Sequence, residues 1–196
     1  MLESVHSTST IFVHLHYILR KRIRMKHWLV ASIGFILILF ASCLGDPENA
    51  SPSESDVVRV GQTVPSFTVS LSDGSIFNSS QMGEKPACIV LFNTTCSDCQ
   101  RELPIVQSMY EEFFRNVRFV CISRAEAEAP IKAYWTNHNL SIPYSAQPDR
   151  SIYNLFALST IPRLYIVNSS GKIVNAYATK VSEKELRRAL EASLYK

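Results

Sequence analysis

Short apolar runs and helix-like periodicity alternate along the chain from residue 57 onward. Two runs, residues 89–93 and 117–123, have the length and composition of buried strands. Apolar residues that repeat every three or four positions predict helices over residues 97–114, 130–139, 151–157 and 182–194. Turn-forming residues between strand-like runs predict two β-hairpins, over residues 67–77 and 163–177. This order predicts an α/β fold in which helices flank a central mixed β-sheet and one hairpin forms an N-terminal extension.

An apolar segment near the N-terminus indicates export from the cytoplasm. Residues 28–40 are all apolar or small, and three basic residues precede them, Arg22, Arg24 and Lys26. The segment is shorter than the ~20 residues of a membrane-spanning helix and has the length of a signal-peptide core. It ends in Phe40-Ala41-Ser42-Cys43, which resembles a bacterial lipobox. The resemblance implies that Cys43 is lipidated and becomes the N-terminus of a membrane-anchored protein; an uncleaved N-terminal anchor is the alternative.

Composition divides the chain into three segments. Residues 1–43 form a leader, within which Met25 begins a signal peptide of ordinary shape and is the expected true start. Residues 44–56 are rich in Pro, Ser and acidic residues, as expected of a flexible linker. Residues 57–196 are long enough to build one domain with a single core. Leu44, rather than Asp, after the lipidated cysteine favours the outer membrane, so we expect the domain on the periplasmic side of the cell envelope.

The distribution of charge limits the possible partners. The chain has a formal net charge of +3, with 20 basic and 17 acidic residues. Residues 1–43 hold five of the basic residues and one of the acidic residues, so the rest of the chain carries a net charge of −1. The expected domain therefore lacks the basic surface that nucleic-acid binding requires.

Two cysteines, Cys96 and Cys99, follow the apolar run at residues 88–92 and open the next predicted helix. At this spacing they lie on one face of the helix, and its N-terminus favours a thiolate, so the pair suits thiol–disulfide exchange. A C-x-x-C pair can also be half of a zinc site. However, the remaining cysteines are single, and His138 is the only histidine after residue 27. We therefore expect no metal, and a redox-active disulfide in place of a cofactor, since no Gly-rich dinucleotide-binding loop is present.

The other two cysteines of the expected domain, Cys88 and Cys121, lie inside apolar runs, residues 87–92 and 117–122. A free cysteine in such a run behaves as a small buried hydrophobic residue, which is the interpretation that we favour. The alternative is that one of them takes part in a second, regulatory disulfide.

Several motifs in a fixed order carry a family resemblance. They are Gly61-x-x-x-Pro65-x-Phe67, Asp73-Gly74, Leu91-Phe92-Asn93-x-x-Cys96-x-x-Cys99-x-x-Glu102-x-Pro104, Thr160-Ile161-Pro162 and Val167-x-x-x-Gly171-Lys172-Ile173. Together they resemble the thioredoxin-like fold and, more narrowly, the membrane-tethered TlpA/ResA-type disulfide reductases of the bacterial cell envelope. The resemblance covers residues 57–196.

This resemblance implies a role for each of four residues. Cys96 is implied to be the attacking thiolate and Cys99 the buried resolving thiol. Pro162 is implied to be a cis-proline that lies against the disulfide, and Ile161 to offer its backbone to an extended substrate segment. Alternatively, Pro162 starts an edge strand. Val90 occupies the position of the buried acid of thioredoxins, which leaves proton transfer at Cys99 unassigned.

The chain departs from the family pattern around these residues. Thr94-Thr95 stand where Trp commonly precedes the first cysteine, and Ser97-Asp98 stand between the cysteines where Pro is frequent. A carboxylate at Asp98 opposes thiolate formation at Cys96, so we expect a reducing rather than an oxidising couple. Asp98 can also be an ordinary acid of a helix N-terminus. Arg163 replaces the Thr or Glu that is frequent after the cis-proline.

We therefore expect a thiol:disulfide oxidoreductase that reduces oxidised envelope proteins or apocytochrome c, with electrons from a membrane donor. Two alternatives remain, a peroxiredoxin-like thiol peroxidase and a non-catalytic binding module with a thioredoxin-like fold. The peroxidase motif Pro-x-x-x-Thr-x-x-Cys fails here, because Ile89 and Asn93 occupy its Pro and Thr positions. The reduction potential of the cysteine pair distinguishes the binding module from the enzymes, since structural disulfides have reduction potentials below about −300 mV.

Overall fold

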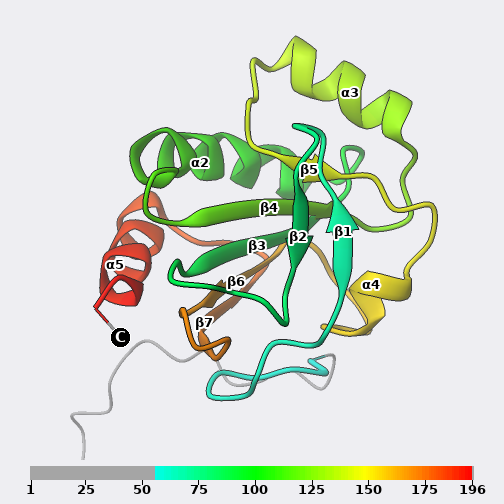
Figure 1. The fold of residues 1–196 in the computed structure, drawn as a ribbon. Coiled ribbons are helices and arrows are strands. Elements are labelled where there is room, and N and C mark those ends of the chain that lie inside the picture. Colours follow the sequence, from blue (N-terminus) through cyan, green and yellow to red (C-terminus); the bar gives the residue numbers. More distant parts are fainter. Residues whose placement is uncertain (1–55, 196) are drawn as a thin grey trace, which may run out of the picture. The chain divides into compact units, whose positions relative to one another are not determined.

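The computed structural model describes residues 56–195. The predicted leader, Cys43 and residues 44–55 of the predicted linker lie outside the described residues. The helices and strands, shown in Figure 1, are β1 (Thr68–Ser70), β2 (Ile76–Asn78), β3 (Ala87–Phe92), α2 (Ser97–Phe113), β4 (Arg118–Ser123), α3 (Glu128–Asn137), β5 (Tyr144–Ser145), α4 (Ser151–Asn154), β6 (Arg163–Val167), β7 (Ile173–Ala178) and α5 (Glu183–Ser193).

Five strands form the central mixed sheet, in the order β5-β4-β3-β6-β7. The central strand β3 pairs in parallel with β4, where Ile89 lies opposite Val120, and antiparallel with β6, where Ile89 lies opposite Tyr165. All six residues of β3 are buried, because a strand covered on both faces needs apolar side chains on both. Helices α2 and α5 pack against each other beside the sheet (Figure 1). This architecture confirms the predicted α/β fold of a mixed sheet flanked by helices.

The β1–β2 hairpin is a separate two-stranded antiparallel sheet that precedes β3 in the chain. Asp73 shapes its turn by accepting a hydrogen bond from the Ser75 N–H at 2.9 Å. The hairpin is tied to the rest of the fold by the Ser72 N–H, which donates to the Tyr144 carbonyl at 2.7 Å. In Figure 1 this hairpin, in cyan, lies in front of the strands of the central sheet. It is the N-terminal extension that the sequence predicts.

Three of the differences from the sequence prediction concern β5, α3 and α4. Strand β5 was not predicted, because its two residues are too few for periodicity, and it is defined by pairing with β4. Helix α3 begins at Glu128, which places Pro130 third in the helix, where the missing N–H costs no intrahelical hydrogen bond. Helix α4 ends at Asn154, before the end of the predicted segment at residue 157.

Cys88 and Cys121 lie inside the sheet core with no exposed surface, which confirms that both are buried. Cys88 pairs with Phe119, and Cys121 lies two residues further along β4. This offset separates the two Cα atoms by about 8 Å, beyond the reach of a disulfide without backbone movement. Burial raises the pKa of the Cys88 thiol to about 12 and that of Cys121 well above its usual value. Both thiols are therefore protonated and unreactive at neutral pH.

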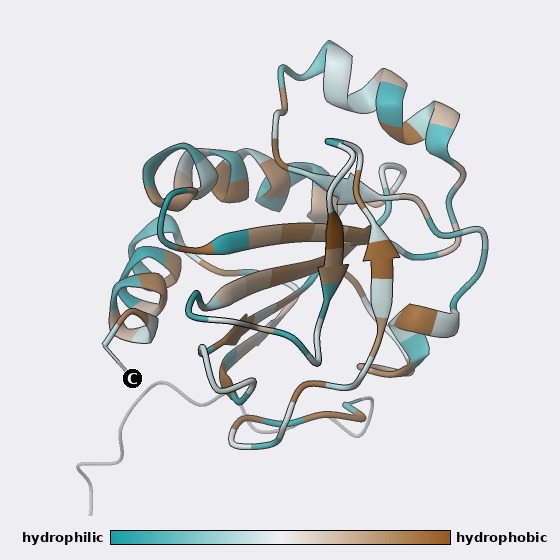
Figure 2. Cartoon of the chain, in the orientation of Figure 1, coloured by the Kyte–Doolittle hydropathy of each residue, from teal (hydrophilic) through white to brown (hydrophobic). Residues whose placement is uncertain are grey.

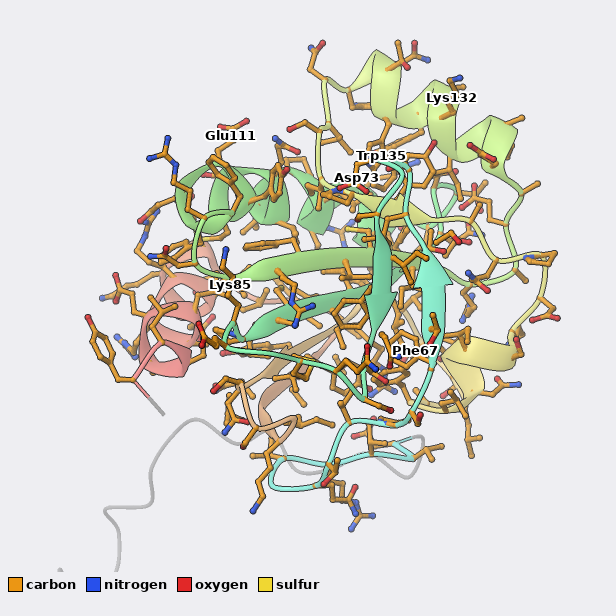
Figure 3. All side chains as sticks on the ribbon, in the orientation of Figure 1. Phe67, Asp73, Lys85, Glu111, Lys132 and Trp135 are labelled. Carbon is orange, nitrogen blue, oxygen red and sulfur yellow. The ribbon has the colours of Figure 1, made fainter. Side chains whose placement is uncertain are left out.

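Hydropathy follows the layers of the fold. Figure 2 shows hydrophobic residues concentrated in the central strands, whereas the helices carry both hydrophilic and hydrophobic residues. Helix α3 directs Trp135 inward, where its Nε1–H donates to the Ile142 carbonyl at 2.9 Å and its ring lies 5.0 Å from the Phe92 ring. Lys132 of the same helix is exposed (Figure 3). Between residues 56 and 195, no helix is long and apolar enough to cross a membrane.

Candidate active site

Cys96 and Cys99 lie where β3 is connected to α2. Cys96 is the N-cap of α2 and has an extended backbone, and its N–H donates to the Asn93 carbonyl at 3.2 Å. Cys96 is partly exposed, whereas Cys99, in the first turn of the helix, is fully buried. Both are free thiols, and no group of three His, Cys, Asp or Glu within residues 56–195 is placed to hold a metal ion. One thiol can meet a substrate while the second lies beneath the surface.

Burial controls the protonation of Cys99. Removal from water raises the pKa of the Cys99 thiol well above its usual range, against the effects of a hydrogen bond from the Asn93 backbone and the charge of Arg124. The neighbouring Cys96 thiol raises this pKa further. Cys99 therefore remains protonated while Cys96 is free, and its ionisation becomes easier once the Cys96 sulfur is held in a mixed disulfide.

A distant loop completes the site. The Ile161–Pro162 peptide bond is cis, and the Cys96 sulfur lies 3.6 Å from the Ile161 carbonyl oxygen. Pairing of β6 with β3 positions this loop, because β6 begins directly after Pro162. Since β6 lies between β3 and β7, Pro162 does not start an edge strand. The fold thus brings Cys96, Cys99, Ile161 and Pro162 together, and their catalytic roles stay predictions.

Asp98 lies on the outer side of α2 and forms an ion pair with Arg101. The two side chains keep exposed fractions of 41% and 67%, respectively, so the pair is well solvated. The guanidinium offsets part of the carboxylate charge. The predicted opposition of Asp98 to thiolate formation at Cys96 is therefore weaker than it would be for an unpaired carboxylate, and this role stays a prediction.

Glu102 is a buried acid on α2, one turn after Cys99, to which sequence analysis assigned no role. The Val181 N–H lies 3.4 Å from both carboxylate oxygens. Burial raises the pKa of Glu102, against the effects of this hydrogen bond and of two nearby cationic side chains. The helix spacing in the sequence already indicated that Glu102 is buried, because position 102 falls on the apolar face formed by Cys99, Leu103 and Val106.

Replacing Glu102 with Gln is expected to stabilise the protein at neutral pH. Because folding raises the pKa of Glu102 above its unfolded value of about 4.3, the folded state binds more protons between the two values. The contribution of Glu102 to stability therefore falls as the pH rises through that window. Gln removes this loss and keeps an acceptor for the Val181 N–H. Free energies of unfolding from urea titrations at pH 4 and pH 7.5 test the prediction.

The gain from Glu102→Gln should be larger at pH 7.5 than at pH 4. Glu191→Gln, which changes an exposed acid on α5, serves as the control and should show no such difference. An equal gain at both pH values, or a loss at pH 7.5, would contradict the assignment of a raised pKa to Glu102.

Thr94 is held by a buried carboxylate from another loop. Glu126, which follows β4, accepts hydrogen bonds from the Thr94 N–H at 2.8 Å and from the Thr94 hydroxyl. Gln100 of α2 donates to the Thr94 carbonyl at 2.8 Å. These contacts fix the loop that carries Cys96. No local pattern predicts them, because Thr94 and Glu126 are 32 positions apart in the chain.

Comparisons with known proteins agree with this geometry. Residues 60–176 match the AhpC/TSA family model. The thiol-disulfide oxidoreductase ResA of Bacillus subtilis is 20% identical over 161 residues, which cover 82% of this chain and 90% of ResA. One similar solved structure is a thiol:disulfide interchange protein of the thioredoxin family from Chlorobium tepidum, with a TM-score of 0.61, 21% identity and coverage of 70% of this chain and 99% of that chain. Another is a secreted thiol-disulfide isomerase from Corynebacterium glutamicum, with a TM-score of 0.63, 15% identity and coverage of 76% and 98%, respectively. The chain therefore belongs to the AhpC/TSA family and is a thioredoxin-like protein of the TlpA/ResA type.

Proposed function

We propose that this thiol:disulfide oxidoreductase acts as a disulfide reductase in the cell envelope. The observation that supports it most is the partly exposed Cys96 sulfur, 3.6 Å from the Ile161 carbonyl, with Cys99 fully buried one turn further along α2. An extended substrate segment that lies along the Ile161 backbone presents its sulfur to Cys96. Cys99 is then close enough to complete the exchange.

The reaction consists of two exchange steps. The Cys96 thiolate attacks one sulfur of the substrate disulfide, the S–S bond breaks, and the other substrate sulfur leaves as a thiolate that takes up a proton. Cys99 then loses its proton and attacks the Cys96 sulfur, which releases the second substrate sulfur as a thiolate that also takes up a proton. The substrate gains two electrons and two protons, and the protein ends with a Cys96–Cys99 disulfide. A membrane-bound dithiol donor reverses this exchange and restores the reduced protein.

The location and partners form part of the same proposal. Lipidation of Cys43 anchors the protein, and residues 44–55 tether the domain at a distance from the bilayer. The lipobox resemblance of residues 40–43 supports the anchor, and Leu44 favours the outer membrane. The substrates are oxidised envelope proteins or apocytochrome c, and the TlpA/ResA type of the chain supports exchange with the disulfides of other proteins.

A thiol peroxidase is the less favoured enzyme. Peroxidases of this branch have a Thr three residues before the reactive cysteine, where this chain has Asn93. The Asn93 Oδ1 atom accepts hydrogen bonds from the Thr95 N–H at 2.9 Å and from the Thr95 hydroxyl at 2.6 Å. The side chain is therefore engaged in shaping its own turn, which favours disulfide exchange over peroxide reduction.

The reduction potential of the Cys96–Cys99 couple tests the proposed function. We expect a reversible couple near about −270 mV, in the thioredoxin range, when the full-length protein in detergent is equilibrated with dithiothreitol buffers and its thiols are alkylated. Cys88→Ser should leave the potential unchanged, because Cys88 is buried away from the site. A potential near about −120 mV would make the protein an oxidant. A value below about −300 mV, or no reversible couple, would favour the binding module.

A further inference from the structure

Arg124 lies beside the cysteine pair at the end of the sheet. It directly follows β4, and because β3 and β4 are parallel neighbours, their C-terminal ends meet at one edge. The Arg124 N–H donates to the Phe92 carbonyl at 2.7 Å, and the Arg124 carbonyl accepts a hydrogen bond from the Asn93 side chain at 3.5 Å. The Arg124 backbone is thus fixed against the loop that leads to Cys96.

An aromatic ring orients the Arg124 guanidinium. The guanidinium carbon lies 5.3 Å from the centroid of the buried Tyr153 ring, at cation–π distance. The Tyr153 hydroxyl donates to the Thr160 carbonyl at 2.8 Å, which connects this ring to the residue before Ile161. Arg150 also lies over Tyr153, at 5.1 Å from the ring centroid. Arg124 is therefore held beside both the cysteine loop and the cis-proline loop.

The hydrogen-bond donors of Arg124 are open to a ligand. Arg124 is partly buried, and within residues 56–195 its guanidinium forms no ion pair and donates no hydrogen bond. Two acids on neighbouring loops are engaged by other groups. Glu126 accepts from Thr94, and Asp149 accepts from the Ser151 N–H at 2.8 Å. The cation–π contact with Tyr153 uses none of the guanidinium N–H groups as hydrogen-bond donors to the protein, which leaves this planar fork available to a carboxylate.

We propose that Arg124 binds an Asp or Glu side chain of the substrate polypeptide, close to the cysteine that Cys96 attacks. This inference rests on the proposed function and narrows its substrate class to disulfides with an acidic neighbour. The position of Arg124 between the cysteine loop and the cis-proline loop sets where that acid must lie. Arg124 acts by positioning the substrate and takes no part in the exchange of electrons.

Two matched peptide substrates test this specificity. Each is a symmetric homodimer joined by one disulfide, and the two differ only by Asp or Asn beside each cysteine. Reduced full-length protein in detergent is mixed with each peptide, and the rate constant of peptide reduction is measured by acid quenching and chromatography. Each rate constant is divided by that of the same peptide with dithiothreitol, because Asp also changes the intrinsic reactivity of the peptide disulfide. The ratio of the two corrected rate constants then reports recognition of the acid by the protein.

The variant Arg124→Gln should lower this ratio to about one. The original protein should prefer the Asp peptide by about fivefold at low salt, and the preference should shrink at high salt. Arg115→Gln is the matched control, because Arg115 also lies over an aromatic ring, 5.6 Å from the centroid of Phe114, but near the other end of α2. It should keep the full preference.

Two results would overturn the inference alone. They are equal rates for both peptides with the original protein, and a preference that persists in Arg124→Gln. Failure to reduce either peptide would instead overturn the proposed function and the inference with it. The two failures are therefore distinguishable in one experiment.

Discussion

The Cys99→Ser protein is expected to accumulate as a mixed disulfide with its substrates through Cys96, and to lose turnover by more than about 1000-fold. The reason is that the two thiols carry out different steps of the exchange. Cys96 is partly exposed and can still attack, whereas Ser at the buried position 99 cannot displace the substrate sulfur from Cys96. Non-reducing electrophoresis of membranes from cells that express the variant, followed by mass spectrometry of the adducts, measures the effect.

Two further variants make the trapping result specific. Cys96→Ser should capture nothing, because the attacking sulfur is absent. Cys88→Ser should turn over normally, because Cys88 lies in the core of the sheet with no exposed surface. Adducts that persist in Cys96→Ser would show that another thiol reacts. Absence of protein partners on Cys99→Ser would count against exchange with envelope proteins.

Local patterns were sufficient to predict the elements that carry the site. The six apolar residues of β3 reflect a strand covered on both faces, and the cysteines three positions apart lie on one helix face. Helix α5 begins with a capping box, in which the Ser182 N–H donates to the Glu185 carboxylate at 2.9 Å, and the two residues stand at the three-residue spacing typical of this motif. In each case the interacting residues are close in the chain, so their spacing is visible in the sequence.

Polar contacts between distant segments were not predictable in the same way. Periodicity indicates which face of an element is apolar, but it does not indicate which polar residues meet across the fold. Arg163 was visible only as a departure from the family pattern, and Asp56 only as one more acid at the end of a polar linker. The structure joins these two residues, 107 positions apart, in an ion pair. Asp56 is therefore part of the folded domain.

Replacing Asp56 with Ala is expected to lower the free energy of unfolding by about 3 kcal/mol. The Arg163 side chain is only 2% exposed and its Asp56 partner 17%, so the variant leaves a buried charge without its counter-ion. Arg163 also donates to the Ser159 carbonyl at 3.0 Å and to the Thr160 hydroxyl at 2.9 Å, in the loop that leads to the cis-proline. We therefore expect disulfide exchange to slow as well. Urea unfolding of the reduced protein measures the stability.

Asp98→Ala is the matched control, because it breaks an ion pair that is well exposed, and it should cost less than about 1 kcal/mol. The double variant Asp56→Ala with Arg163→Met should be more stable than Asp56→Ala alone, since an apolar side chain of similar length removes the uncompensated charge. If Asp56→Ala lowers the free energy of unfolding by no more than Asp98→Ala does, the Asp56–Arg163 ion pair does not hold the loop before Pro162. A large cost that the double variant recovers would establish that Asp56 stabilises the site through the charge of Arg163.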